Sequence, residues 1–286
     1  MSQELLQAIG RAAVEAAFPD GRSYAAISTN RVRRLAQRFG TPPRQIEITA
    51  LENEVVPERY TRNMRTFSLS DQATLLRSHA AVVGLGGLGG GVTELLARAG
   101  VGRLTLIDGD RFEDSNLNRQ LMSTVALLGK PKADAAAARV AAVNPSVEIR
   151  THAVFLDPGN AGRLLKGADV VVDCLDSLDS RRNLQRACRR LEIPLVSAAV
   201  AGFSGQLTAI FPGDGGFDLI YGPRDADQPA KGVETSLGTI PSTVTLMSSL
   251  EANEVFAILL KGSSSLRHRL LVVDLTTYSF ECFKLS

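Results

Sequence analysis

The feature that most constrains the fold of this chain is a glycine-rich loop set between two short apolar runs. The run Ala80–Val83 leads into the sequence Gly-Leu-Gly-Gly-Leu-Gly at residues 84–89, and a second apolar run ends at Asp108. A strand, a tight glycine turn, a helix and a second strand are typical of a βαβ unit that binds a nucleotide. Asp108 follows the loop by roughly 20 residues, the spacing at which a carboxylate accepts hydrogen bonds from ribose hydroxyls.

The glycines of this loop have separate physical tasks. Gly84 permits the tight turn after the strand, and Gly86 and Gly87 let a ligand approach backbone N–H groups. Gly89 allows the helix to pack closely on the strand, and the helix N-terminus attracts negative charge. Asp110, which follows the second strand, is either a further ligand or a turn former. The loop therefore predicts a nucleotide site.

Composition limits the class of protein. The 286 residues are 44% hydrophobic and 22% charged, which predicts a globular chain with one large domain, alone or with a small one. The net charge of +2 gives no reason to expect nucleic acid or a membrane as partner. Three cysteines without a CxxC pair exclude a disulfide framework and favour a cytoplasmic location. We find no signal peptide and no apolar stretch of roughly 20 residues.

The first 65 residues differ from the rest, and we expect a small helical extension at 1–65 before a larger domain at 66–286. Helical spacing of apolar residues predicts helices over residues 5–16, Asn30–Phe39 and 43–55. The last two superficially resemble a helix-turn-helix. The second of them carries two glutamates and little chemistry for reading bases, so we favour a helical hairpin packed on its own domain.

From residue 78 onward, β-branched apolar runs alternate with helical patterns, which predicts a mostly parallel sheet covered by helices on both faces. Strands are expected at Ala80–Val83, Leu104–Ile107, Val147–Thr151, Val170–Cys174, Leu195–Ala199, Gln206–Phe211, Leu270–Leu275 and Ser279–Leu285. Helices are expected at Gly90–Ala99, Lys132–Val143, Ala161–Lys166, Ser180–Leu191 and Ser242–Leu260. The last strands are expected to be antiparallel, and residues 214–231 are the best candidate for a mobile loop.

Polar residues follow the second strand, in the runs 114–120 and 129–132. A dinucleotide dehydrogenase has no general need for Arg119 and Lys132 at this place, whereas an enzyme that acts on a triphosphate does. The guanidinium fork and the compact ammonium both bind phosphate oxygens. The two side chains therefore favour a triphosphate ligand.

Acidic residues end another strand, in the sequence Asp-Cys-Leu-Asp-Ser at 173–177. Asp176 could hold Mg²⁺ against phosphates, because Mg²⁺ is bound by one or two carboxylates together with phosphates and water. Asp173 lies nearer the strand and is expected to be structural. Cys174 between them is expected to be an inert core residue.

Taken together, these motifs resemble the HesA/MoeB/ThiF family, the bacterial relatives of ubiquitin-activating enzymes. The resemblance extends from about Pro57 to the C-terminus. It rests on Arg59-Tyr60-Thr61-Arg62, the glycine loop, Ala99–Asp108, Ser115–Gln120, Gly129–Lys132, Asn144-Pro145, Asp173–Ser177, Pro194–Ser197 and Gly202–Gln206. It implies a Rossmann-like α/β fold.

The resemblance also implies an activity. The family uses Mg²⁺ and ATP to adenylate the C-terminal glycine carboxylate of a small ubiquitin-like sulfur carrier protein ending in Gly-Gly, for thiamine, molybdopterin or related cofactor synthesis. It implies a homodimer in which Arg62 reaches the partner's triphosphate as an arginine finger. The implied catalytic residues are Arg62, Arg119, Lys132 and Asp176, the last also as the Mg²⁺ ligand. The implied nucleotide contacts are Gly84, Gly86, Gly87, Asp108, Asp110, Ser115, Asn116, Arg119, Lys132 and Ser177.

The chain departs from the family at its cysteines. Many relatives bind zinc through two CxxC pairs, but residues 216–221 and 266–269 contain no cysteine, so no structural zinc is expected. Residues 232–238 lack the cysteine that some relatives use for a thioester or persulfide. We therefore expect the chemistry to end at adenylation, with sulfur delivered by another protein. Cys188 and Cys282 are expected in the core.

Three other functions stay open. The first is an adenylating enzyme for a peptide or an RNA-linked substrate, with residues 1–65 as its recognition module. The second is an NAD(P) oxidoreductase, although His79, His152 and His268 fall at poor positions for hydride chemistry. The third is a non-catalytic scaffold, against which the intact set of charged site residues counts.

Overall fold

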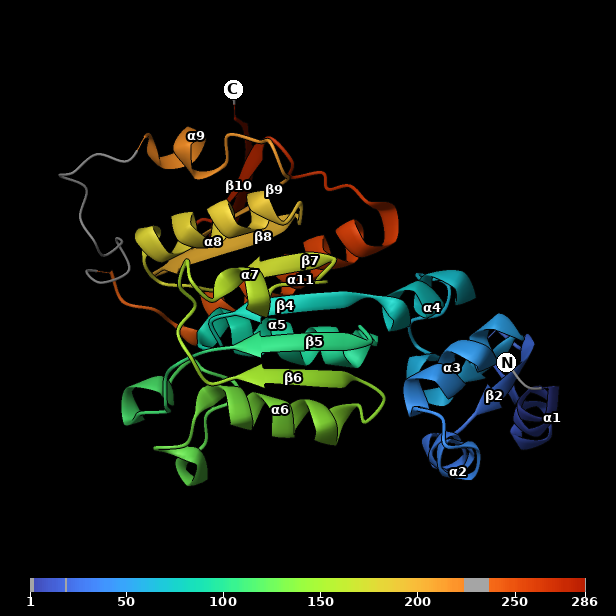
Figure 1. The fold of residues 1–286 in the computed structure, drawn as a ribbon. Coiled ribbons are helices and arrows are strands. Elements are labelled where there is room, and N and C mark those ends of the chain that lie inside the picture. The colour runs from blue at the N-terminus through green and yellow to red at the C-terminus, as the bar shows by residue number, and fades with distance from the viewer. Residues whose placement is uncertain (1–2, 19, 224–236, 286) are drawn as a thin grey trace.

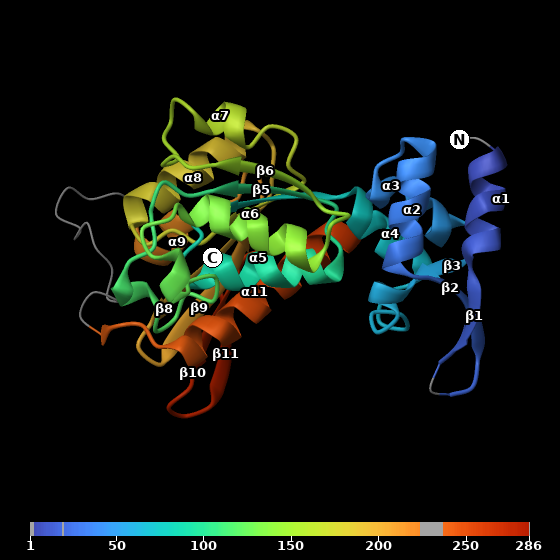
Figure 2. The ribbon, with the colours of Figure 1, turned by 90° about the horizontal axis from the view of Figure 1, so that it is seen from below.

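A small N-terminal unit and a larger part built on a sheet lie next to each other along the molecule (Figure 1). The computed structural model describes residues 3–18, 20–223 and 237–285. Two views at right angles show the N-terminal unit beside α4 (Leu69–Arg77), the helix that leads into the central strand β4 (His79–Val83) (Figures 1 and 2). The unit therefore lies at the end of the sheet where β4 begins.

The larger part is organised around an eight-stranded sheet with the order β11-β10-β9-β8-β7-β4-β5-β6. Strands β8, β7, β4, β5 and β6 are parallel to one another, whereas β9, β10 and β11 are antiparallel additions. This confirms the predicted sheet. Besides β4, the strands are β5 (Arg103–Ile107), β6 (Glu148–His152), β7 (Val170–Asp173), β8 (Leu195–Ala201), β9 (Ser204–Ile210), β10 (Arg269–Asp274) and β11 (Ser279–Lys284).

Alternate residues of the strands supply two hydrophobic cores, one on each face of the sheet. In β4, Ala80 and Val82 belong to one core, and Ala81 and Val83 belong to the other. The first core is covered by α5 (Gly87–Ala99), α6 (Lys132–Val143) and α11 (Pro241–Lys261). The second is covered by α7 (Ala161–Leu164), α8 (Leu178–Arg190) and α9 (Phe217–Tyr221).

The predicted helices of the larger part are present, with two additions. Helix α4 was not predicted, although Ser68 and Asp71 form a capping box at its start. Helix α9 lies inside the predicted loop 214–231, of which residues 224–231 lie outside the described residues.

Helix α11 is 21 residues long and has a mean hydropathy of 1.3, so by length and composition alone it could cross a membrane. This differs from the expectation that no such stretch exists. Half of the segment is buried inside the fold, where α11 packs against α5 and β8. A core helix of a globular protein has the same composition, and the packing identifies α11 as one.

The sequence predicted a purely helical N-terminal unit, and this prediction is wrong. It contains a three-stranded sheet in the order β1-β2-β3 beside three helices. The elements are α1 (Gln3–Ala12), β1 (Val14–Ala17), β2 (Ser23–Ile27), α2 (Thr29–Phe39), α3 (Pro43–Glu52) and β3 (Val55–Pro57). Residues 14–16, expected in the first helix, belong to β1 and pair with β2 as a hairpin, because tertiary pairing overrides the helix propensity of Ala and Glu.

Candidate active site

The candidate site lies where β4 and β7 end side by side. β7 pairs with one edge of β4, whereas β5, the strand that follows β4 in the sequence, pairs with the other edge. The order of strands therefore reverses between β4 and β7. Ligands bind at such reversal points in open α/β sheets. Gly84 passes the end of β7 so closely that a Cβ would stand 2.5 Å from the carbonyl oxygen of Cys174, and its φ is +88°. Only glycine fits this turn.

The glycine loop leads into an uncapped helix. Helix α5 begins at Gly87, and its N-cap residue, Gly86, provides no side-chain hydrogen bond. A Cβ on Gly89 would overlap with the carbonyl oxygen of Gly84, which accounts for the predicted close packing of helix and strand. The N–H groups of the first turn are therefore left to attract an anion.

Asp108 is fixed by the loop it was predicted to accompany. Its Oδ2 accepts a hydrogen bond of 2.6 Å from the backbone N–H of Leu85, and its Oδ1 accepts one of 2.7 Å from that of Asp110. The residue is 9% exposed. Each carboxylate oxygen keeps lone pairs for a ribose hydroxyl, while the loop holds the carboxylate in place.

The polar run after β5 forms a tight turn beside the glycine loop. The amide of Asn116 is buried, and its Oδ1 accepts a hydrogen bond of 3.1 Å from the N–H of Glu113. Arg119 donates at 2.9 Å to the carbonyl oxygen of Ser115 and at 2.9 Å to the side chain of Asn118. Asn116 thus shapes the turn, and Arg119 lies next to the start of α5, because its carbonyl oxygen faces Gly87.

Lys132 begins α6 and is almost completely buried. Its ammonium lies 3.1 Å from Oδ2 of Asp110, whose side chain is 54% exposed. A phosphate oxygen at this place would share the ammonium with Asp110. The structure therefore brings Lys132 and Asp110 together at the same edge of the sheet as the glycine loop.

Asp176 follows β7 and is exposed. In the part of the chain that the structure describes, no three His, Cys, Asp or Glu side chains form a group that could hold a metal. A single carboxylate at a strand end still fits Mg²⁺, which is bound through one or two carboxylates together with substrate phosphates. Ser177 is the N-cap of α8 and accepts a hydrogen bond of 3.2 Å from the N–H of Ser180. Its hydroxyl already has a structural task.

A buried network behind the site was not foreseen in full. Asp173 is buried, as expected, and accepts a hydrogen bond of 2.7 Å from the hydroxyl of Ser197. Burial raises the pKa of Asp173, and the Arg181 guanidinium, 3.7 Å away, opposes that rise. Arg181 also donates to the carbonyl oxygen of Leu175, in the turn that carries Asp176. In the sequence, Arg181 resembles the other arginines of a surface helix, so no signal marked it.

Gln120 is a second residue that the prediction missed. Its side chain lies against Gly86, and the residue is 6% exposed. Its Oε1 has no hydrogen-bond partner among the described residues. Buried polar groups are normally paired, so this oxygen is a candidate acceptor for a bound nucleotide or an ordered water. The residue ends the motif Ser115–Gln120, and the motif was the available signal.

The cysteines fit their predicted places except one. Cys174 lies with its Sγ 3.6 Å from Oε2 of Glu251, and burial raises the pKa of this thiol, which agrees with an inert residue. Cys188 is buried on α8. Cys282 lies on β11, as predicted, but it is exposed and does not belong to the core. The reason is that β11 is the edge strand and most of its residues face solvent.

Arg62 lies far from the glycine loop of its own chain. The neighbouring Tyr60 packs at the C-terminal end of α5, where a Cβ on Gly100 would stand 2.7 Å from the ring of Tyr60. Helix α5 has 13 residues. At 1.5 Å per residue the two ends are about 20 Å apart. Arg62 is exposed there, so one chain by itself does not unite all the predicted residues.

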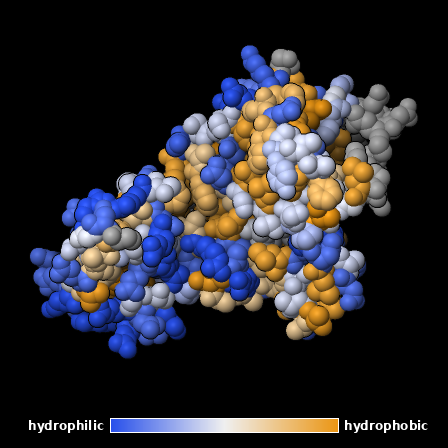
Figure 3. All heavy atoms as spheres, turned by 180° about the vertical axis from the view of Figure 1, so that it is seen from behind, coloured by the Kyte–Doolittle hydropathy of each residue, from blue (hydrophilic) through white to orange (hydrophobic). Residues whose placement is uncertain are grey.

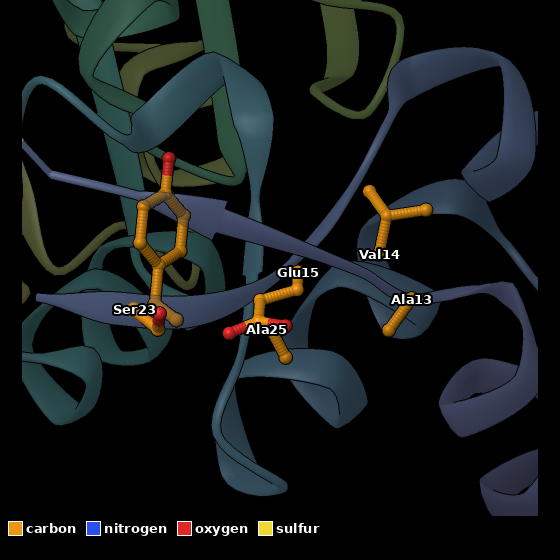
Figure 4. Close-up of a pocket in the computed structure, with 6 residues that line it drawn as sticks. Ala13, Val14, Glu15, Ser23 and Ala25 are labelled. Carbon is orange, nitrogen blue, oxygen red and sulfur yellow. The ribbon is translucent and has the colours of Figure 1, made fainter.

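An open hollow of about 320 Å³ lies elsewhere, beside the hairpin of β1 and β2. Figure 4 shows Val14 and Glu15 of β1 and Ala25 of β2 around it. The hollow belongs to the N-terminal unit and contains no residue of the predicted nucleotide site.

Known proteins resemble the chain over most of its length. The ThiF family model matches residues 60–286. The SAMP-activating enzyme E1 of Haloferax volcanii is 36% identical over 228 residues, which cover 78% of this chain and 83% of that protein. The adenylyltransferase and sulfurtransferase MOCS3 of Bos taurus is 37% identical over 248 residues, which cover 85% of this chain and 53% of MOCS3. The chain therefore spans about half the length of MOCS3.

A solved structure extends the likeness to the N-terminal unit. Escherichia coli MccB, crystallised with MccA-N7isoASN, has a TM-score of 0.71 and 18% identity, over 99% of this chain and 87% of that chain. At this identity the likeness concerns the fold. The same protein has also been crystallised with ATP.

Proposed function

Because this chain belongs to the ThiF family, we propose that it is an ATP-dependent adenylyltransferase that activates the C-terminal glycine carboxylate of a small ubiquitin-like sulfur carrier protein. The names of two relatives support this activity, since one is a SAMP-activating E1 enzyme and the other an adenylyltransferase and sulfurtransferase. The crystallisation of MccB with ATP supports the nucleotide.

The observation that carries the proposal is the set of groups near the ends of β4, β5 and β7, where the strand order reverses. The start of α5 follows β4 and is uncapped, Arg119 lies next to it, Lys132 begins α6, and Asp176 follows β7. The first three attract phosphate oxygens, and the fourth provides a ligand for Mg²⁺. This combination suits a nucleoside triphosphate better than an uncharged ligand or a redox cofactor.

The reaction forms one bond and breaks one. An oxygen of the substrate carboxylate bonds to the α-phosphorus of ATP, and the bond from that phosphorus to the bridging oxygen of pyrophosphate breaks, with its electron pair leaving on pyrophosphate. No proton is transferred. Both reactants are anions, so Arg119 and Lys132 lower the barrier by neutralising the phosphate oxygens as charge shifts between them. Mg²⁺ held by Asp176 would supply further neutralisation of the phosphates.

We also propose that the active form is a homodimer in which Arg62 of one copy reaches the nucleotide of the other. The distance of about one helix length between Arg62 and its own glycine loop supports a contribution in trans. The surface supports association as well. Figure 3 shows a mostly hydrophilic N-terminal unit and apolar patches on the larger part. Phe203, Phe280 and Phe283 of the larger part are each at least half exposed.

ATP–pyrophosphate exchange tests the proposal. The wild-type chain should exchange labelled pyrophosphate into ATP when a carrier ending in Gly-Gly is present, and Asp176→Ala should abolish the exchange. Asp134→Asn, which removes another exposed carboxylate at the start of α6, is the matched control and should keep full activity. Full exchange by Asp176→Ala would refute the assigned role. Tighter binding of NAD than of ATP would instead favour the oxidoreductase.

A second candidate function is adenylation of a peptide. The likeness to MccB covers 99% of this chain, including the N-terminal unit that the family model leaves out. In that unit, β1 is an edge strand beside the open hollow of Figure 4, and an extended peptide can add to such an edge. The test is whether peptides stimulate exchange in place of the carrier. Stimulation by the carrier alone would exclude this candidate.

A further inference from the structure

Residues 59–65 form the turn that carries Arg62, and residues on both sides of Arg62 in this turn contact the N-terminal unit. Arg62 is exposed, and in the described parts of the chain no ion pair or hydrogen bond involves its guanidinium. Its neighbours from Arg59 to Arg65 are held by the N-terminal unit. Arg62 therefore has a free side chain on a fixed backbone. Most of the unit that fixes this backbone lies outside the ThiF match, so the family model does not account for it.

On the inner side, the anchor is Glu47 of α3, which is completely buried. Its Oε1 lies 3.3 Å from Nε of Arg59, and its Oε2 accepts a hydrogen bond of 3.3 Å from the hydroxyl of Tyr60. Arg59 also donates at 3.2 Å to the hydroxyl of Thr29. Glu47 and Thr29 therefore hold the two residues that begin the turn.

On the outer side, the anchor is the hairpin of β1 and β2. The hydroxyl of Tyr24 donates at 3.4 Å to Oγ1 of Thr61, which directly precedes the free arginine. Arg65 forms an ion pair with Asp20, and its guanidinium lies 5.8 Å from the centre of the Phe18 ring. Phe18 in turn stacks on Tyr24 at 4.2 Å. Both flanks of the turn are thus tied to one small structure.

The unit is also tied to the larger part. Asn144, which ends α6, donates at 2.9 Å to the hydroxyl of Tyr60 and accepts a hydrogen bond from Arg59. Across the same junction, Arg44 of α3 lies 3.1 Å from Glu148 of β6. The position of the turn is therefore set relative to the sheet on which the nucleotide site is built.

We propose that the N-terminal unit positions Arg62 so that it reaches the nucleotide of a second copy of this chain, and that Glu47 is the main positioning residue of the unit. This inference rests on the proposed function, because it takes Arg62 to act on the partner's triphosphate. An arginine side chain loses rotational freedom when it binds a phosphate. If the backbone that carries Arg62 is already rigid, binding costs no further conformational entropy. A misplacement of a catalytic group by about 1 Å can lower a reaction rate by about 100-fold.

Mixed dimers test the inference. One subunit carries Arg62→Ala and keeps Asp176, and the other carries Asp176→Ala and keeps Arg62. Only the site that joins Asp176 of the first to Arg62 of the second can then exchange pyrophosphate. Glu47→Gln is added to either subunit. On the subunit that supplies Arg62 it should lower the exchange rate about tenfold or more. On the other subunit it should change nothing, since that Arg62 is already absent.

Two further variants control for folding. Tyr24→Phe removes a contact to Thr61 from the half-buried hairpin, and it should act on the same subunit as Glu47→Gln, with a smaller loss. Glu4→Gln breaks the exposed pair of Glu4 and Arg38 elsewhere in the unit and should have no effect on either subunit.

Each contrary result has its own meaning. An equal loss of exchange rate with Glu47→Gln on either subunit would show that Glu47 acts on stability alone. No loss on either subunit would show that the N-terminal unit does not position Arg62. Both results overturn the inference. An inactive mixture of the two starting subunits, with an active wild type, would overturn the action in trans and leave adenylation standing. An inactive wild type would overturn the proposed function and the inference with it.

Discussion

The two ends of helix α5 are built in opposite ways. At its N-terminal end the N-cap residue is glycine and no side chain caps the helix. At its C-terminal end the side chain of Gln72 donates at 2.8 Å to the carbonyl oxygen of Ala99, and that of Asn144 donates at 2.9 Å to the carbonyl oxygen of Ala97. We call these the open end and the closed end.

The difference shows which end of α5 has backbone N–H groups available to bind a ligand. Helix ends leave backbone groups without partners, and side chains or ligands must satisfy them. At the closed end the protein itself does so, and the same side chains join α4, α6 and the N-terminal unit. At the open end the positive partial charge of the helix is left for a ligand. Changes at the open end should therefore alter nucleotide binding, and changes at the closed end should alter stability and the placement of Arg62 without altering nucleotide binding.

The largest expected effect is at the open end. Arg119→Ala should lower the rate of ATP–pyrophosphate exchange by about 100-fold to 1,000-fold, because a cation that meets the shifting phosphate charge is lost. The free energy of unfolding, measured with urea, should hardly change, since Arg119 is only half-buried. Arg111→Ala removes an exposed arginine a few residues away and should retain activity. A stability loss in Arg119→Ala that matches its activity loss would break the comparison.

Gly89→Ala should damage both properties at once. Its Cβ would overlap with the carbonyl oxygen of Gly84, so the loop or the helix must shift, at a cost of about 3 kcal/mol in unfolding free energy. Calorimetric binding of ATP should weaken as well. Gly162→Ala in α7, where a Cβ meets nothing within 4 Å, is the matched control and should leave both properties unchanged.

At the closed end, Gln72→Ala should cost stability without affecting the nucleotide. The variant leaves the carbonyl oxygen of Ala99 and the amide of Asn63 without their partner in a buried place, which costs about 2 kcal/mol. The affinity for ATP of the folded protein should equal that of the wild type. Thr74→Ala on the same helix is the control, with a change of about 0.5 kcal/mol or less. Weaker ATP binding in Gln72→Ala would show that the two ends are coupled.

The smallest expected effect is a difference in pH dependence. Burial raises the pKa of Glu251, beside Cys174 near the open end, well above its ordinary value, and it raises that of Glu47 near the closed end against the opposing charge of Arg59. A raised carboxyl pKa stabilises the fold below the ordinary pKa, and this stability is lost as pH rises through the raised value. Relative to wild type, Glu251→Gln should gain stability with rising pH, and Glu47→Gln should gain less. Urea unfolding between pH 4 and 8 measures both, and equal gains would refute the ranking.

The sheet was predictable because its signals are local. Each apolar run from Ala80–Val83 onward became a strand, and every strand of the larger part follows the predicted order. The hairpin of β1 and β2 was not predictable, since residues 14–17 favour a helix by composition and become a strand only through pairing with β2. Helix α4 could have been found, because its capping box is visible in the sequence at Ser68 and Asp71.

The site was predictable as a set of strand ends, and its supports were not. Asp108 and Asp176 follow strands in the sequence, Lys132 begins the helix after β5, and the ends of neighbouring parallel strands meet in space. The partners of Asp108 and Lys132, by contrast, are set by the path of loops. The association of Glu47 with Arg59 and Tyr60 depends on how α3 packs, and no periodicity in the sequence encodes that contact.

The order of strands also has a consequence for synthesis of the chain. The glycine loop follows strand β4, but β4 pairs on one edge with β7, which is made only after β5, α6 and β6. While the chain emerges from the ribosome, β4, α5, β5, α6 and β6 can assemble first, with the edge of β4 that faces β7 still bare. A nucleotide stabilises only a state that binds it. Because Asp176 follows β7, the complete set of predicted nucleotide contacts exists only once Val170–Asp173 has joined the sheet.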